Sequence, residues 1–379
     1  MEEGQLVAGR ATPEGTRRYA ERFRQLPGHF RCPDRLFLSS LGLGTKLGGP
    51  AGADNLLYRT AVPHALERGI NVFDTALSYR MMESERTLGT ALARAFAEGK
   101  ARRDEVYVIT KGGYLTIDPR SPAVGRDGRR YLVETYVQSG LVDPDGVVNG
   151  VHALDPPFIQ DQIERSRRNL GLETIDLYCL QEPELQLLAR GPNEFHDLLA
   201  RVFATLEEAA ARGAIASYGL STWSGLLTDH LERGHLAVVE LFQLALEVGG
   251  PDNHLRAVQL PYSLVMGEAQ GLKSQFGPEG QTGVFQSLLD TGTTVFATAP
   301  LVQGRAVRGL PAFVREAFPE LRTDAQCCLQ FARSTPGVTT ALVGMRQTEH
   351  VDENLAVAEV EPAPADVIED LFERARDAA

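Results

Sequence analysis

Three polar side chains, Asp74, Tyr79 and Lys111, combine residue types that together can donate a proton. An ammonium group favours the phenolate form of a nearby tyrosine and lowers its pKa from about 10, while a carboxylate holds the ammonium in place. Such a tuned acid is a better proton donor, and general acid catalysis typically contributes about 10²- to 10⁴-fold to a rate. The sequence therefore predicts that Tyr79 acts as an acid beside Lys111 and Asp74.

Each of these residues also has a simpler interpretation. Asp74 could cap a turn, Tyr79 could pack in a loop, and Lys111 could be a surface charge. All three lie at or just after the ends of two successive short runs that have the composition of strands. This shared position favours a catalytic role. The next run of this kind ends in Gln181, and glutamine can donate a hydrogen bond but cannot titrate.

Short apolar, β-rich runs alternate with amphipathic helical stretches from about residue 36 onward. This alternation is typical of parallel strands joined by crossover helices. We expect strands over residues 39–45, 71–76, 106–111, 176–181, 215–222, 257–263, 294–300 and 339–345. Helical patterns include residues 56–68, 83–97, 159–170, 194–211, 324–334 and 349–357. These units follow one another without a linker, which predicts an α/β fold with a single (β/α)8 TIM barrel.

The barrel is expected to span residues 36–379, after an N-terminal extension over residues 1–35. Within the extension, residues 12–25 read as a polar helix that would cover the bottom of the barrel. The stretch between the third and fourth strands is longer than one crossover unit needs, which predicts an insertion at about residues 114–154. Because long loops at the carboxyl ends of barrel strands often control substrates, we expect a lid, with surface decoration as the alternative.

The composition excludes several classes of protein. The chain of 379 residues is 43% hydrophobic and has a net charge of -12, so nucleic-acid binding is not expected. No apolar run approaches the roughly 18 residues of a membrane span, and the N-terminus lacks the pattern of a secretory signal, which favours a cytoplasmic location. The four cysteines have no metal-ligand spacing, so we expect buried thiols and no metal site. The sequence does not indicate an oligomeric state.

A set of longer motifs occurs in barrel order along the chain. The motifs are ALERGINVFDTALSYR, VYVITKGG, GLETIDLYCLQEPE, RGAIASYGLST, AVQLPYSL, ATAPLVQGR and ALVGMRQTEHVDENL. Together they resemble the aldo-keto reductase superfamily over roughly residues 36–358. In that family an Asp-Tyr-Lys-His tetrad works with NADPH, and the tyrosine protonates a carbonyl oxygen while the nicotinamide delivers hydride to carbon. The resemblance implies this role for Asp74, Tyr79 and Lys111, whereas Gln181 stands where the family has histidine.

The resemblance also implies a binding site for NADPH or NADP. Ser221, Thr222 and Gln259 would hold the nicotinamide carboxamide. Arg346 would pair with the ribose 2'-phosphate, near the helix N-terminus where barrel phosphate sites typically form. Further positions that match the family's cofactor site are Leu301, Gly304, Gly344, Glu353 and Asn354. Relatives usually carry an aromatic residue that stacks on the nicotinamide where this chain has Thr298.

Two further residues and one short motif could also have a functional role. His152, inside the insertion, either replaces the missing histidine or is structural. Glu182 is a conceivable replacement acid, although alternation along the strand predicts that it points away from the side of Gln181. The run Gly-Leu-Gly-Thr-Lys-Leu at residues 42–47 begins like a dinucleotide fingerprint, but Leu47 stands where the third glycine belongs, so we interpret it as a strand end.

The sequence therefore predicts an NADPH-dependent oxidoreductase that reduces a carbonyl, or an activated double bond, of a small organic substrate. Tyr79 would be its proton donor. Gln181 and Thr298 leave two alternatives, which are an NADPH-binding regulatory protein with little turnover and a non-redox lyase or isomerase on the same scaffold.

Overall fold

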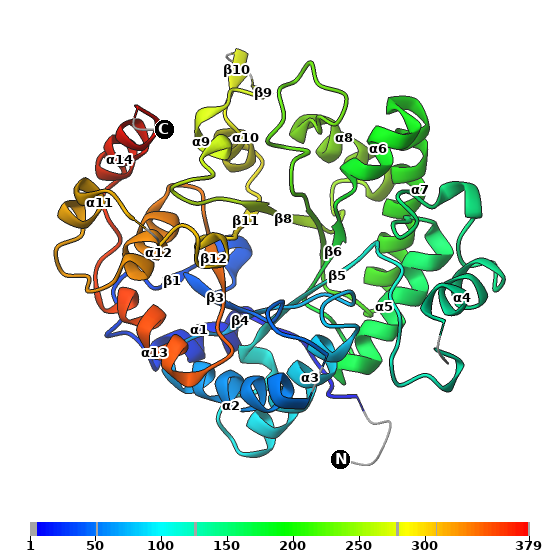
Figure 1. Cartoon of the computed structure of the whole chain (residues 1–379), viewed down its shortest axis with the longest axis horizontal. Helices are drawn as coiled ribbons and strands as arrows, with labels where there is room; N and C mark the ends of the chain where they lie inside the picture. The colour runs from blue at the N-terminus through cyan, green and yellow to red at the C-terminus, as the bar shows by residue number, and fades with distance from the viewer. Residues whose placement is uncertain (1–5, 51, 125–126, 278–279, 308, 378–379) are drawn as a thin grey trace.

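A closed barrel of parallel strands forms the centre of the molecule (Figure 1). The computed structural model describes residues 6–50, 52–124, 127–277, 280–307 and 309–377. In that part of the chain, eight strands close the barrel in the order β11-β12-β3-β4-β5-β6-β7-β8. They are β3 (Leu41–Gly44), β4 (Val72–Asp74), β5 (Tyr107–Gly112), β6 (Leu177–Gln181), β7 (Tyr218–Ser221), β8 (Leu255–Pro261), β11 (Thr294–Thr298) and β12 (Thr340–Gly344). The predicted (β/α)8 barrel is confirmed.

Helices surround the barrel on its outside (Figure 1). The long connections contain α2 (Gly52–Arg68), α3 (Glu83–Ala97), α5 (Pro156–Leu170), α7 (Pro192–Ala211), α8 (Val238–Gly249), α10 (Val284–Asp290), α12 (Asp324–Ser334) and α13 (Thr348–Leu355). The helix α5 shows why these segments fold as they do, because Phe158, Ile159 and Ile163 recur on one face and are buried. It ends at Gly171, whose φ of 66° is the left-handed conformation that glycine adopts at little cost.

The core has an outer shell between the helices and the strands and a smaller interior cluster. The interior cluster includes Tyr107, Cys179 and Phe296, and the rings of Tyr107 and Phe296 stack with centroids 6.1 Å apart. The expectation of buried thiols holds for Cys179 and for two cysteines of α12, but Cys32 is exposed. The barrel is thus a filled core rather than a pore.

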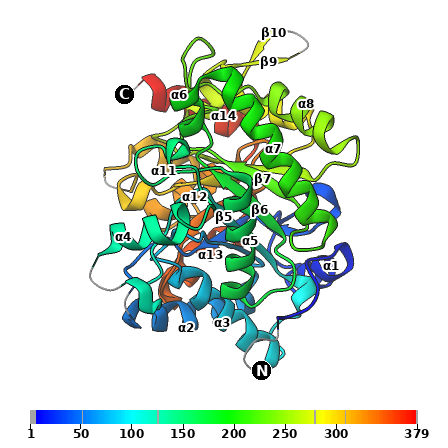
Figure 2. The same ribbon diagram turned by 90° about the vertical axis from the view of Figure 1, so that its right-hand side faces the viewer.

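The N-terminal extension packs against the ends where the strands begin. Its helix α1 (Pro13–Glu21) is capped by the Thr12 hydroxyl and ends earlier than predicted. Arg18 of α1 binds the carboxylates of Asp104 at 2.7 Å and Glu105 at 2.8 Å, just before β5. A hairpin of β1 (Phe30–Arg31) and β2 (Leu38–Ser39) follows. In Figure 2, α1 lies at one end of the barrel and α4 (Gly128–Leu132) at the other. Residues 1–5 of the predicted extension lie outside the described residues.

The predicted insertion is anchored to the outer helices. Its helix α4 lies at the periphery, beyond α5 (Figure 1). Tyr136 is buried and packs on Phe158 of α5 with ring centroids 5.4 Å apart. Arg120 donates two hydrogen bonds to Glu83 of α3, at 2.6 and 2.7 Å. These contacts fix the insertion beside the rim of the barrel, while its role as a lid stays a prediction. Residues 125 and 126 lie outside the described part.

A buried histidine joins the hairpin to the barrel and gives a testable pH dependence. His29 Nε2 donates to the Gly69 carbonyl oxygen at 3.0 Å, and its Nδ1 lies 3.0 Å from the Ser40 hydroxyl. Burial lowers the pKa of His29 from 6.5 to about 3. The unfolded chain therefore binds a proton between these pH values that the folded chain does not, so the free energy of unfolding falls as pH falls.

We expect His29→Gln to remove this contribution to acid sensitivity. One such histidine contributes at most about 1.4 kcal/mol per pH unit. Denaturant unfolding at pH 7 and pH 5 measures the slope, with His196→Gln as the control because His196 is 58% exposed. A slope in His29→Gln as steep as in the wild-type protein and in the control would contradict the assignment.

Candidate active site

Strand register brings the predicted site residues to one end of the barrel. Gly344 of β12 pairs with Gly44 of β3, and Gly44 pairs with Asp74 of β4. Further around the barrel, Gln181 pairs with Ser221, and Ser221 pairs with Gln259 of β8. These positions are at or near the carboxyl ends of their strands, which is the face where barrel enzymes hold their active sites.

A buried ion pair lies at the centre of this end. Lys111 Nζ donates to Asp74 Oδ1 at 2.6 Å and to the Thr75 carbonyl oxygen at 2.7 Å. Burial opposes the charged form of Lys111, but Asp74 and Tyr79 together outweigh burial and raise the pKa of the ammonium group. Gln259 Nε2 donates to the same Asp74 oxygen at 2.9 Å. Asp74 therefore holds both Lys111 and Gln259 in place.

Tyr79 lies above this ion pair, on the turn that follows β4. Its half-buried ring has its centroid 4.9 Å from Lys111 Nζ. Burial raises the pKa of Tyr79 above 10, and Lys111 opposes this increase without cancelling it. The lowered pKa that we expected from the sequence is therefore wrong, because the surrounding protein desolvates the phenolate. Tyr79 carries its proton at neutral pH and can donate it.

Gln181 lies beside the turn that carries Tyr79. Its Oε1 accepts a hydrogen bond from the Ser78 hydroxyl at 3.2 Å. Among the residues that the structure describes, no hydrogen bond uses its Nε2. Gln181 is nearly buried, at 9% exposure, so this amide group is held in one place. It can offer a substrate oxygen a hydrogen bond but no proton. Ser78 is a site residue that the sequence analysis missed, because a lone serine in a turn carries no pattern.

His152 does not replace the missing histidine. It is fully buried, with Nε2 lying 2.9 Å from the Gln181 carbonyl oxygen and Nδ1 lying 3.2 Å from Gln186 Nε2. An amide nitrogen can only donate, so Nδ1 accepts and Nε2 carries the proton that bonds to Gln181. Burial lowers the pKa of His152, which is therefore neutral. Of the two interpretations, the structure supports the structural one.

Glu182 departs from the alternation predicted for its strand. Its φ of 48° lies in the left-handed region, so the chain turns immediately after β6 ends. The carboxylate accepts a hydrogen bond from the Tyr114 hydroxyl at 2.6 Å, and its charge contributes to the raised pKa of Tyr79. Glu182 is therefore close enough to the site to influence the pKa of Tyr79, and its left-handed backbone means that the alternation of a strand does not set its direction.

Thr222 and Gln259 differ in what they can offer a ligand. The Thr222 hydroxyl donates to Glu184 Oε1 at 2.9 Å and accepts from the Gly225 N–H at 2.8 Å, so it caps the turn after β7. Its proposed contact with a carboxamide stays a prediction, as does that of half-buried Ser221. Gln259 Oε1 is buried and has no hydrogen-bond partner in the described part of the chain. A buried acceptor without a partner is costly unless a ligand supplies a donor.

The residues assigned to the nucleotide end surround β12 and the loop after β11. Arg346 NH1 lies 2.8 Å from Asp54 Oδ1, and the arginine side chain is 40% exposed. A Cβ atom at Gly344 would lie 2.6 Å from the Leu47 side chain, so a larger residue there would require Leu47 to move. After β11 the backbone has positive φ at Ala299, Val302, Gln303 and Gly304, next to half-buried Leu301. On α13, Glu353 is exposed and Asn354 is buried.

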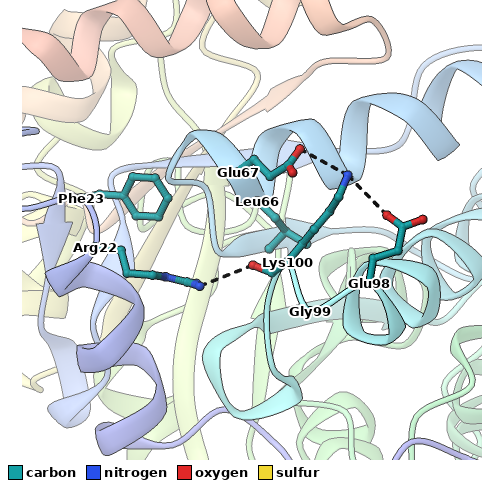
Figure 3. Close-up of a pocket in the computed structure, with 7 residues that line it drawn as sticks. All are labelled: Arg22, Phe23, Leu66, Glu67, Glu98, Gly99 and Lys100. Atoms are coloured by element: carbon teal, nitrogen blue, oxygen red, sulfur yellow. Dashed lines mark hydrogen bonds and ion pairs between the residues drawn. The ribbon is translucent and has the colours of Figure 1, made fainter.

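A surface hollow near the N-terminal end of the barrel is separate from this cluster (Figure 3). It lies between α1, α2 and the end of α3, and it is lined by Arg22, Phe23, Leu66, Glu67, Glu98, Gly99 and Lys100. Lys100 Nζ lies 3.3 Å from Glu67 and 3.4 Å from Glu98, so its charge is already paired. The described residues contain no cluster with the ligands of a metal ion, and none of their helices is long and apolar enough to cross a membrane.

Comparison with known proteins identifies the family of this barrel. A family model described as Aldo/keto reductase family matches residues 40–304. The chain belongs to the aldo/keto reductase family. Two curated relatives are an NADH-specific methylglyoxal reductase of Escherichia coli (strain K12) and a D-threo-aldose 1-dehydrogenase of Pseudomonas sp. The first is 26% identical over 209 residues, which is 54% of each chain. The second is 32% identical over 174 residues, which is 45% of this chain and 44% of that protein. The chain thus aligns with about half the length of each.

Solved aldo-keto reductase structures have the same fold. The holo form of an enzyme from Bacillus halodurans has a TM-score of 0.60 and 21% identity, and the match covers 90% of this chain and 95% of that one. An aldo-keto reductase from Klebsiella pneumoniae in complex with NADPH has a TM-score of 0.60 and 19% identity, covering 91% and 94%. These likenesses confirm the fold that the aldo-keto reductase motifs predicted.

Proposed function

We propose that this aldo/keto reductase family member reduces a carbonyl, or an activated double bond, of a small organic substrate with NADPH. The observation that carries the proposal is the stack of Asp74, Lys111 and Tyr79 at the carboxyl end of the barrel. In this stack a neutral phenol lies against a charged ammonium group, which is the arrangement that a proton donor needs.

The residues of the chain fit the nicotinamide cofactor that this chemistry requires. The unpartnered Gln259 oxygen is a ready acceptor for the amide hydrogens of a carboxamide, and Arg346 offers a guanidinium group for a phosphate. When bound, the cofactor would supply the hydride. The cofactor site would be completed by Ser221, Leu301, Gly304, Gly344, Glu353 and Asn354. Thr222 would contact the carboxamide only after its hydroxyl releases Glu184.

Each protein group then has a separate task in the proposed reduction. The Tyr79 hydroxyl donates a hydrogen bond and then its proton to the substrate oxygen as that oxygen gains negative charge. Lys111 stabilises the phenolate left behind, and Asp74 keeps Lys111 charged and in position. The Gln181 amide donates a second hydrogen bond to the oxygen, which stabilises developing charge without transferring a proton. For a carbonyl, carbon receives the hydride and oxygen receives the proton, so the product is an alcohol. For an activated double bond, the β-carbon receives the hydride and Tyr79 protonates the oxygen, and the resulting enol becomes the saturated carbonyl when its proton moves to the α-carbon.

The direct test separates cofactor binding from turnover. Fluorescence titrations with NADPH and NADH measure the two affinities, and we expect NADPH to bind more tightly because of Arg346. Oxidation of the bound cofactor is then followed over a panel of aldehydes, ketones and enones. Tight binding without multiple turnover would favour the regulatory alternative, and a product formed without cofactor oxidation would favour the lyase or isomerase alternative.

A further inference from the structure

One exposed lysine beside Tyr79 has no role in the proposed chemistry. Lys46 follows the end of β3 and is exposed, yet its Nζ lies only 5.8 Å from the centroid of the Tyr79 ring. Within the described part of the chain it forms no ion pair, whereas Lys111 is paired with Asp74 and Arg346 with Asp54. Lys46 is therefore an unpaired positive charge next to the proposed proton donor.

The backbone on both sides of Lys46 is fixed. The Thr45 hydroxyl and N–H both donate to the Asp74 carbonyl oxygen, at 3.1 and 3.0 Å. On the other side, Tyr58 donates its hydroxyl to the Leu47 carbonyl oxygen at 3.0 Å, and the Leu47 side chain packs over Gly344. The loop thus directs Leu47 toward β12 and leaves Lys46 to extend over Tyr79. The fold thus fixes the backbone from which the Lys46 side chain extends.

The negative charges near Tyr79 are already engaged by other groups. Asp74 accepts from Lys111 and Gln259, and Glu182 accepts from Tyr114. A contact between an ammonium group and a ring uses none of the three N–H donors of Lys46 for a hydrogen bond. These donors therefore remain available to a ligand whose oxygen is held at Tyr79.

We propose that Lys46 selects substrates that carry an anionic group, a carboxylate or a phosphate, close to the reacting carbonyl. The inference rests on the proposed function, because it takes Tyr79 as the point where the carbonyl oxygen binds. The anion would accept hydrogen bonds from the Lys46 ammonium group while the carbonyl oxygen accepts from Tyr79. Charge-assisted hydrogen bonds of this kind are the stronger ones in proteins.

Matched pairs of substrates test this selection. The neutral and anionic members are butanal with succinic semialdehyde, for a carboxylate, and glyceraldehyde with glyceraldehyde 3-phosphate, for a phosphate. We expect Lys46→Met to lower kcat/KM for the anionic member of at least one pair by roughly 10- to 100-fold, mainly through KM. The neutral members should change far less, and Lys46→Arg should recover most of the loss. The pair that responds identifies the anion.

The control variant is Lys100→Met, which removes the same charge from the surface hollow beside α1 (Figure 3). It should leave the preference between members of each pair as in the wild-type protein. Raising the ionic strength should reduce kcat/KM for the anionic substrate in the wild type and in Lys100→Met, and much less in Lys46→Met. Equal losses for neutral and anionic members in Lys46→Met would overturn the proposal.

A binding measurement keeps this inference separate from the proposed function. Butyrate and butanamide match in size and differ in charge, and neither can be reduced by hydride transfer under these conditions. Calorimetric titration of the cofactor-loaded protein should show tighter binding of butyrate, and Lys46→Met should abolish the difference. If no substrate is turned over but butyrate is preferred through Lys46, the proposed function fails and the anion site stands. If Lys46→Met instead weakens NADPH binding and leaves butyrate binding unchanged, Lys46 serves the cofactor and the inference is wrong.

Discussion

Tyr79→Phe is expected to lower turnover of any carbonyl substrate by about 10²- to 10⁴-fold. The substitution removes the proton that Tyr79 would donate and keeps the ring that lies 4.9 Å from Lys111 Nζ. Cofactor affinity should therefore stay close to that of the wild-type protein, and the loss should appear in kcat. Single-turnover oxidation of bound NADPH, compared with a direct cofactor titration, measures both quantities.

Tyr114→Phe is the matched control for Tyr79→Phe. It removes the other phenol hydroxyl of this region, the one that donates to Glu182 at 2.6 Å. We expect a much smaller effect on turnover, because among the described residues Tyr114 forms neither a hydrogen bond nor a cation–π contact with Lys111. If the two variants lost activity equally, the loss in Tyr79→Phe would not be specific to its hydroxyl. If Tyr79→Phe lost none of the activity, the assignment of Tyr79 would fail.

Gln181→His is expected to raise carbonyl turnover by about 10²-fold. Gln181 already ends β6 next to Ser78 and can donate a hydrogen bond to the substrate oxygen. An imidazole at this position would keep a donor and add a group that titrates near neutral pH, so proton transfer could be shared with Tyr79. Steady-state kcat for the same carbonyl panel, measured from pH 5 to 9, would show the gain and a new dependence on pH.

Gln181→Leu separates the contribution of the amide from that of proton transfer. It keeps the size of the side chain and removes its hydrogen-bond donor, so we expect kcat to fall below that of the wild-type protein. A result in which Gln181→His and Gln181→Leu are both inactive would show that the natural site depends on the amide itself. Unchanged kcat in both variants would exclude Gln181 from the chemistry.

The sequence by itself determined the barrel scaffold and the placement of the main polar residues at one end of it. Eight alternating strand and helix units without a linker favour a barrel over an open sheet, and the carboxyl ends of its parallel strands lie on one face. That argument placed Asp74 and Lys111 together, and the structure joins them by a hydrogen bond. The assignments of Arg346 and the other cofactor residues came instead from the resemblance to a family, and they remain proposals.

The tertiary structure alone decided how these groups are protonated, paired and directed. The sequence shows that Tyr79 has a lysine available, but only the tertiary structure shows that burial outweighs the lysine and raises the pKa of Tyr79. The same holds for His152, whose two ring nitrogens find partners far away in the chain, and for Glu182, which leaves its strand through a left-handed residue. Lys46 lay in a segment that we interpreted as a plain strand end. Its position over Tyr79 depends on contacts of the neighbouring residues with β4, α2 and β12, and no pattern in one segment contains contacts between segments.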